Sequence, residues 1–162
     1  MPQKHKKVLR TILWLCTLAV AAAIFVFSSQ SGPESSALSN FLADWIIGAI
    51  DPDFEVLGAA DQASVFSFVR KLVRKGAHFS EFAALGFCIR LLLHTYKMNH
   101  RSSGAWLAGT LYACTDEAHQ LFVASRAGMW QDVLLDSCGV LGGVAVAYAM
   151  VTLWKRMRGV AA

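Results

Sequence analysis

Charged residues are scarce in this 162-residue sequence, at 16% of the chain, whereas 56% of its residues are hydrophobic. Both values lie well away from those of soluble domains. The scarcity is greatest in two runs, residues 11–33 and 137–154, which contain no charged side chain. About 20 such residues in a helix cross a bilayer, and neither run shows the single apolar stripe of a helix on a soluble core. The sequence therefore predicts one integral membrane domain, residues 1–162.

Several patterns that would indicate other protein classes are also missing. The four cysteines have no CxxC spacing, so we interpret them as packing residues. No basic stripe with interleaved aromatic residues is present, and we expect no nucleic-acid partner. No GxxxxGK[ST] phosphate loop accompanies the helicase-like DEAH at 116–119. The first apolar run ends without an A-x-A-like site, which favours a retained helix over a cleaved signal peptide.

We place four transmembrane helices, at about residues 8–27, 77–96, 104–123 and 133–154, of which hydropathy alone supports the first and the last. The first and last rest on the two uncharged runs. The second and third are poorer in apolar residues, because charged side chains interrupt them. Only eight uncharged residues separate Glu81 from Arg90. A run of that length is too short to span a bilayer, so the polar ends of these helices need their own explanation.

The segment between the first two of these helices carries helical patterns as well. Apolar residues recur at helical spacing from Ser36 to Ile50, which predicts an amphipathic helix in the membrane interface. A second amphipathic stretch begins near Asp61 and leads toward the helix at 77–96. The sequence thus predicts an all-α fold: an integral membrane four-helix bundle with an amphipathic interfacial helix in its first outer loop.

Lysines and arginines indicate the orientation. With a cytoplasmic N-terminus, nine of them fall in cytoplasmic segments and five in outer segments. Positive charge is enriched on the cytoplasmic side of membrane proteins, so we expect both termini to be cytoplasmic. Residues 28–69 contain six acids and no lysine or arginine, as suits an outer loop.

In this topology, polar side chains gather at the outer ends of the helices. Charged groups within membrane spans are costly and normally face a bundle interior or a wet cavity, so this gathering is a functional-site hypothesis. The candidate catalytic residues are His78, Glu81, Asp116, Glu117, His119 and Asp132. The candidate substrate-binding residues are Arg74, Lys75, Gln120 and Arg126. By spacing, Asp116, His119 and Gln120 share one helix face, and Glu117 points about 100° away from Asp116.

These residue types allow several chemistries. Arginine and lysine suit a lipid phosphate or pyrophosphate, and histidine beside carboxylates suits general acid–base catalysis. The same side chains include ligands of divalent metals, so a metal of unknown identity is an open alternative. The acids and bases could also simply neutralise one another. Rows of small residues predict close helix contacts on two helices: Ala105 and Gly109, and Gly139, Gly143 and Ala147.

Three segments resemble the VanZ-like membrane family, named for a protein linked to resistance against teicoplanin. They are residues 27–30 (FSSQ), 74–82 (RKGAHFSEF) and 115–122 (TDEAHQLF), and the likeness continues from Arg126 to Gly143. The resemblance implies a small four-helix protein of the bacterial cytoplasmic (inner) membrane. It also implies a link, in some members, to glycopeptide or other envelope-active antibiotics.

The chain departs from the family at a few positions. Ala124 and Ser125 stand where the family often has Pro-Gly, and Phe82 where Tyr is common. Asp136 replaces a frequent Asn, which adds a carboxylate whose role is open. None of these departures removes a matched His, Arg or acid of the main motifs.

Three functions remain open. An enzyme, as a membrane-embedded hydrolase or transferase, would act at the outer leaflet on a lipid or a lipid-linked phosphate of the cell envelope. A non-catalytic binding or scaffolding protein would use the polar cluster for helix packing, or would intercept an amphiphilic antibiotic. Transport or proton relay would use the same charges, but no polar pathway continues past Arg90. Membrane lipids are expected partners in every case, and altered sensitivity to glycopeptide antibiotics is an expected phenotype.

Overall fold

The computed structural model describes residues 3–51, 53–126 and 128–159. The described chain is helical, and no strand occurs in these ranges. In chain order its elements are α1 (Gln3–Ser28), α2 (Gly32–Ile50), the short 3₁₀ helix η1 (Phe54–Val56), α3 (Ala59–His94), α4 (Arg101–Gln120) and α5 (Trp130–Met157). The predicted all-α class is therefore confirmed.

Three of these helices, α1, α3 and α5, are long and apolar enough to cross a membrane. The predicted transmembrane bundle of four helices is thus supported for three of its members. Helix α4 falls short because its inner face is built from small and polar residues, including buried Ala105, Gly109, Asp116 and Gln120. Its exposed face still carries large apolar side chains: Trp106, Leu107 and Leu111.

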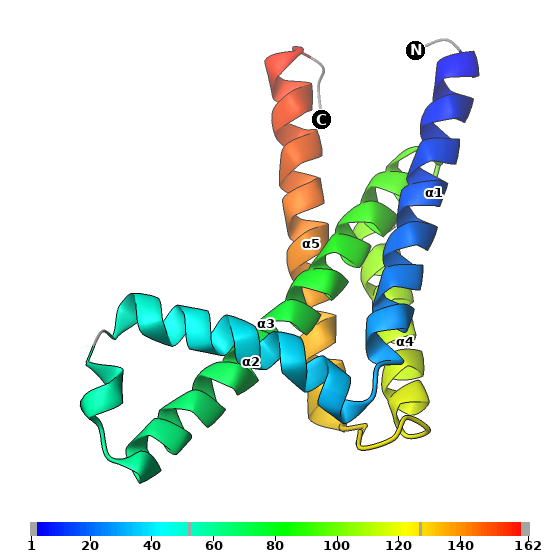
Figure 1. The fold of residues 1–162 in the computed structure, drawn as a ribbon. Coiled ribbons are helices and arrows are strands. Elements are labelled where there is room, and N and C mark those ends of the chain that lie inside the picture. Colours follow the sequence, from blue (N-terminus) through cyan, green and yellow to red (C-terminus); the bar gives the residue numbers. More distant parts are fainter. Residues whose placement is uncertain (1–2, 52, 127, 160–162) are drawn as a thin grey trace.

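Helix α3 differs from the predicted helix at 77–96. It begins at Ala59, so the amphipathic stretch near Asp61 and the spanning segment form one helix of 36 residues. Nothing in the sequence breaks it, because all three prolines precede residue 53. At 1.5 Å per residue it is about 54 Å long, which exceeds a hydrocarbon core of about 30 Å. Its first half therefore extends with α2 to one side of the bundle (Figure 1).

Helix α2 packs on α3 and is the predicted amphipathic helix. It buries the narrow face formed by Ser39, Ala43 and Ile47. Phe41 and Trp45 on the opposite face are 66% and 68% exposed. Aromatic and aliphatic side chains exposed at this density suit a helix whose outer face meets lipid.

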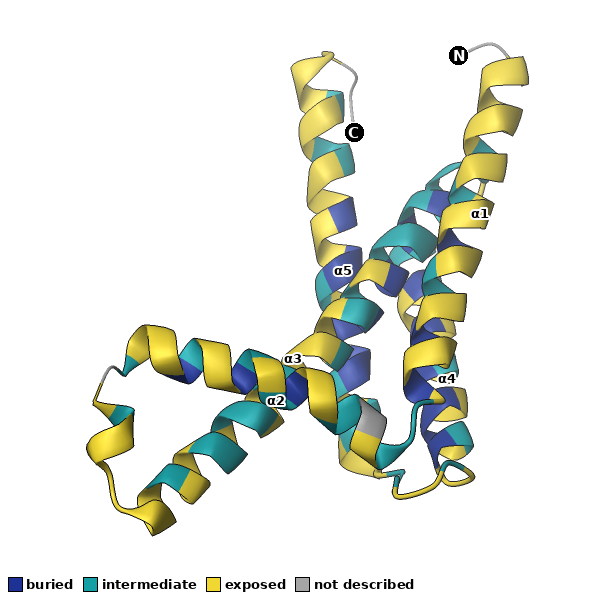
Figure 2. Cartoon of the chain, in the orientation of Figure 1, coloured by how far each residue is buried: buried dark blue, intermediate teal, exposed yellow. Residues whose placement is uncertain are grey.

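The hydrophobic core of the bundle lies between α1, α3, α4 and α5, and within it α3 and α5 touch backbone to backbone. A Cβ added at Gly139 or Gly143 of α5 would collide with backbone carbonyl oxygens of Phe79 or Ala83 on α3. In the other direction, Gly86 of α3 meets the backbone of Val140. The predicted close contact through Gly139 and Gly143 is therefore present, and Figure 2 shows the buried residues concentrated on the inward faces of α3, α4 and α5.

The helices α1, α3, α4 and α5 alternate in direction (Figure 1). As a result, the first turns of α1, the last turns of α5 and the α3–α4 connection lie at one end, here called the basic end. The α1–α2 and α4–α5 connections lie at the other end, here called the polar end.

Gly143→Ala is expected to lower the free energy of unfolding by about 1–3 kcal/mol, because the new methyl group would push α3 and α5 apart. Thermal melting of the detergent-purified protein measures the effect. Gly142→Ala is the matched control, since its Cβ would meet Phe79 Cζ at an ordinary 3.6 Å. Equal melting temperatures for the two variants would contradict the close-packed contact.

Candidate functional site

Three titratable side chains meet between α3, α4 and α5 at the polar end. They are His78, Asp116 and Asp136, and one potential ligand atom from each lies within 4.8 Å of the other two. Asp136 is fully buried, Asp116 is 4% exposed and His78 is half-buried. Both carboxylate oxygens of Asp136 and Nδ1 of His78 are buried without a hydrogen-bond partner among the described residues. We call these three residues the inner triad.

A hydrogen-bonded layer lies next to the inner triad and involves the last turn of α4. Gln120 Nε2 donates to Asp116 Oδ2 at 3.0 Å and to Glu117 Oε1 at 3.3 Å. Glu117 Oε2 accepts the backbone N–H of Met129 at 2.9 Å, directly before α5 begins. Asp116 and Glu117 therefore both turn inward toward Gln120, although their spacing predicted different directions. Adjacent residues of a helix point about 100° apart, and both can face protein where the helix packs against more than one neighbour, as α4 does.

Arg126 joins this layer to the end of α1. Its guanidinium donates to the carbonyl oxygens of Gln30 at 3.2 Å and Phe27 at 3.3 Å, and to Gln120 Oε1 at 3.4 Å. Burial, and then the charge of Arg74, lower the pKa of the Arg126 side chain from its ordinary value. Three carboxylates oppose this lowering: Asp116, Glu117 and Glu81. An arginine stays charged at neutral pH, so Arg126 is a fixed cation at the site.

Ser125, just before Arg126, has a φ of +60°, in the left-handed region that favours glycine. The resemblance noted in the sequence implies a Pro-Gly pair at residues 124 and 125, where this chain has Ala124 and Ser125. Ala124 beside it accepts the backbone N–H of Gly32 at 3.2 Å, which ties this loop to the start of α2. A second backbone bond, from Arg126 N–H to the carbonyl oxygen of Val123 at 3.2 Å, closes the turn itself.

The remaining predicted cations and acids lie around the rim. Lys75 Nζ and Asp132 Oδ1 form a salt bridge of 2.9 Å, with side chains 55% and 32% exposed. A pair this exposed contributes only about 0–1 kcal/mol, so an incoming anion can replace Asp132. Arg74 and Glu81 are half-buried on α3, and Arg74 forms no salt bridge among the described residues. The charges of Arg74 and Asp132 both act on His78.

His119 stands apart from the inner triad. Its Nε2 lies 3.1 Å from Ser29 Oγ, and its ring packs against Phe25 with centroids 4.7 Å apart. The structure therefore places His119 on the side of α4 that faces α1. The predicted shared face of Asp116 and His119 is split between two neighbours, because α4 is in contact with α1 as well as with α3 and α5.

Asp136 is the residue that sequence reasoning left without a role. The available signal was a carboxylate at the edge of an 18-residue uncharged run, one turn after Asp132. Its place at the start of the predicted helix at 133–154 put it with the polar residues at the outer helix ends, without indicating how deeply it is buried. The structure instead buries it completely, because Gly139 brings this turn of α5 against the backbone of α3 beside His78.

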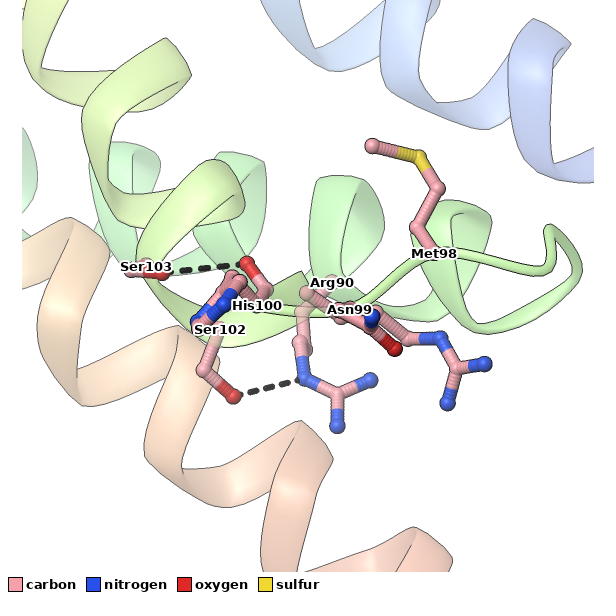
Figure 3. A pocket seen from close by; sticks show the side chains of 7 residues that line it. Arg90, Met98, Asn99, His100, Ser102 and Ser103 are labelled. Carbon is pink, nitrogen blue, oxygen red and sulfur yellow. Dashed lines mark hydrogen bonds between the residues drawn. The ribbon is translucent and has the colours of Figure 1, made fainter.

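The basic end has a different composition. All eleven acids of the chain fall within residues 34–81 and 116–136, so none belongs to the segments of this end. Arg90 Nε donates to Ser102 Oγ at 3.0 Å, and Figure 3 shows it beside the α3–α4 connection. Arg90 and residues 98–103 line an open pocket of about 580 Å³. A second pocket of about 590 Å³ is lined partly by Lys6, His94 and Arg101.

Comparison with known protein families matches residues 13–153 to the family described as VanZ/LLP1. The match covers most of the chain, including α2, the inner triad and the loop that carries Arg126, and it confirms the resemblance seen in the motifs. Comparisons with curated proteins and with solved structures find no match.

Arg126→Lys is expected to lower the free energy of unfolding by about 1.5–3 kcal/mol, because a point-like ammonium cannot serve three acceptors spread over α1 and α4. Chemical or thermal denaturation in detergent measures it. Arg156→Lys, at an exposed arginine near the end of α5, is the control and should melt as the wild type does. An unchanged Arg126→Lys protein would show that this contact does not hold the polar end together.

Proposed function

The chain belongs to the VanZ/LLP1 family, and we propose that it is a multi-pass protein of the bacterial cytoplasmic membrane that binds and acts on a lipid-linked phosphate of the cell envelope. In this proposal α4 is a fourth span and both termini are cytoplasmic. The alternating helix directions and the acid-free basic end support that orientation, since positive charge is enriched on the cytoplasmic side. The polar end then lies at the outer leaflet.

One observation carries the proposal: Arg74 and the exposed Lys75 stand at the rim of a site whose interior holds a histidine and the carboxylate of Asp136, which is unpartnered in the described part of the chain. Arg74 has no salt-bridge partner among the described residues, and Lys75 is held only by an exposed pair with Asp132. Both side chains lie on the long helix α3. The first half of this helix, which extends beyond the bundle, carries exposed apolar residues that can face lipid. A phosphate carried on a lipid can approach along this helix and meet Arg74, Lys75 and Arg126, because Arg and Lys are the preferred phosphate partners.

The groups beneath the rim are suited to proton transfer. Glu81 and His78 lie one turn apart on α3, and the charges of Asp116 and Arg126 act on Glu81. In hydrolysis of a lipid diphosphate, the oxygen of a water molecule would form a bond to the terminal phosphorus. The bond between that phosphorus and the bridging oxygen would break at the same time. A general base, Glu81 or His78, would accept the proton of the water. The electron pair of the broken bond would remain on the lipid phosphate that departs. We include in the proposal an altered sensitivity to glycopeptide antibiotics, as the family resemblance implies.

A non-catalytic scaffolding role is the second candidate, and a specific set of contacts favours it. Gln120, Arg126 and Glu117 are all bonded within the protein and fasten α4 to α1 and α5. Residues used in this way stabilise the bundle, and their loss would reduce stability and function together. Glu81 and Arg74 have no such bonds, so variants at these positions distinguish the two candidates.

Arg74→Gln is expected to weaken binding of a polyprenyl phosphate about ten-fold or more, because a charge-assisted contact to phosphate is worth about 1.5–3 kcal/mol. Fluorescence titration of the detergent-purified protein with the lipid measures the affinity. Lys71→Gln, one turn earlier on α3 and exposed, is the control and should bind as the wild type does. Equal affinities for the wild type, Arg74→Gln and Lys71→Gln would contradict the proposed phosphate site.

Glu81→Gln is expected to abolish phosphate release from a polyprenyl diphosphate while leaving lipid affinity and melting temperature nearly unchanged. The amide keeps the shape of the carboxylate but cannot accept the proton. Glu117→Gln is the comparison: both oxygens of Glu117 accept hydrogen bonds, from Gln120 and from Met129 N–H, and an amide keeps only one acceptor oxygen, so this variant should melt earlier. If Glu81→Gln turns over normally, or if both variants lose activity only as they lose stability, the scaffolding role replaces the enzymatic one.

A further inference from the structure

The inner triad is arranged as a binding site for one ion. Asp136 is fully buried, and both of its carboxylate oxygens lack partners among the described residues. Asp116 lies beside it, with a ligand atom within 4.8 Å. Two neighbouring carboxylates at this depth repel each other and are costly to bury unless something positive stands between them.

No cation forms a salt bridge with Asp116 or Asp136 among the described residues, although the charges of Arg126 and Asp116 act on each other. Arg126 is occupied by carbonyl oxygens at the end of α1 and by Gln120, and Lys75 is paired with Asp132 at the rim. Nδ1 of His78, the third member of the triad, is buried without a partner. A neutral imidazole offers a nitrogen lone pair to a cation. All three side chains of the inner triad can therefore offer an atom that binds a cation placed between them.

We propose that His78, Asp116 and Asp136 bind a divalent metal ion of the zinc type. One imidazole nitrogen and two carboxylate oxygens suit zinc or manganese better than magnesium or calcium, which take oxygen ligands. Three protein ligands leave a coordination position open, as in catalytic rather than structural zinc sites. Ligand atoms around zinc lie about 3.5 Å apart at bond lengths of about 2.0–2.2 Å, so atoms that lie within 4.8 Å of one another have to approach by at most about 1.3 Å.

The neighbouring contacts also supply a second shell for the ion. Gln120 Nε2 donates to Asp116 Oδ2 at 3.0 Å, which fixes the orientation of that carboxylate. The backbone contact of Gly139 with Phe79 holds α5 against α3 close to Asp136 and His78. The metal site deepens the proposed function and rests on it: the ion would take up His78 as a ligand, which leaves Glu81 as the residue that accepts the proton.

The test is metal binding by the full-length protein in detergent, stripped with a chelator and titrated with Zn²⁺ or Mn²⁺ alone. We expect one ion per chain and a higher melting temperature with the metal. Asp136→Asn should bind at least ten-fold more weakly. The same variant should melt higher than the wild type in chelator, because it removes one of two repelling charges, and this gain shows that it folds.

Two controls separate the site from adventitious binding. Asp44→Asn on α2 and His94→Gln at the basic end each remove a potential ligand far from the triad and should leave the affinity unchanged. A wild-type melting temperature that neither metal moves, or equal affinities for wild type and Asp136→Asn, would overturn the inference. Polyprenyl phosphate binding measured in chelator distinguishes failure of the metal site from failure of the lipid site. If the lipid binds and no metal binds, the metal inference is wrong and the proposed lipid site is retained.

Discussion

The architecture of the polar end depends on one backbone contact, in which two glycines of α5 allow that helix to touch α3 directly. Gly139 and Gly143 meet carbonyl oxygens of Phe79 and Ala83, where any larger residue would hold the helices apart. Phe79 is the neighbour of His78, and Gly139 lies less than one turn from Asp136. The contact that packs the bundle therefore also sets the distance between the acid and the histidine.

The two ends of the molecule follow from this packing in different ways. At the polar end, acids are forced into the interior and are covered by Gln120, Glu117 and Arg126, which fasten α4 to α1 and α5. At the basic end, arginines and lysines surround open pockets with no acid nearby. Such an end suits contact with anionic head groups, which need only a cationic surface. Among the described residues, buried polar atoms without a partner occur at both ends, but only at the polar end do they include both oxygens of a carboxylate, that of Asp136, which calls for a specific ligand.

Much of the fold could be predicted from hydropathy and spacing. Two uncharged runs gave α1 and α5, and a helical apolar pattern gave α2, because each signal comes from consecutive residues. The joining of two predicted segments into α3 was not predicted, since a change from amphipathic to apolar pattern looks like a boundary even where no proline or turn interrupts the chain. The span of α4 could not be decided by hydropathy, because its inward face is small and polar.

The site was predicted as a set of residues and only partly as a geometry. Helical spacing places Asp116 and His119 on one face, but it does not say that a face can border two neighbouring helices, and His119 packs on Phe25 and Ser29 of α1. The role of Asp136 stayed open because its burial depends on Gly139 and on α3, which lies far away in sequence. Local pattern thus identified the chemistry, while tertiary packing decided which groups meet.

The central claim is that the polar end holds a phosphate-bearing lipid. Native mass spectrometry of the protein released directly from its own membrane tests it most directly. We expect a population of protein carrying one phosphate-bearing envelope lipid, which is lost in the Arg74→Gln protein and kept in the Lys71→Gln protein. Bare protein alone, or the same lipids on wild type and Arg74→Gln, would contradict it.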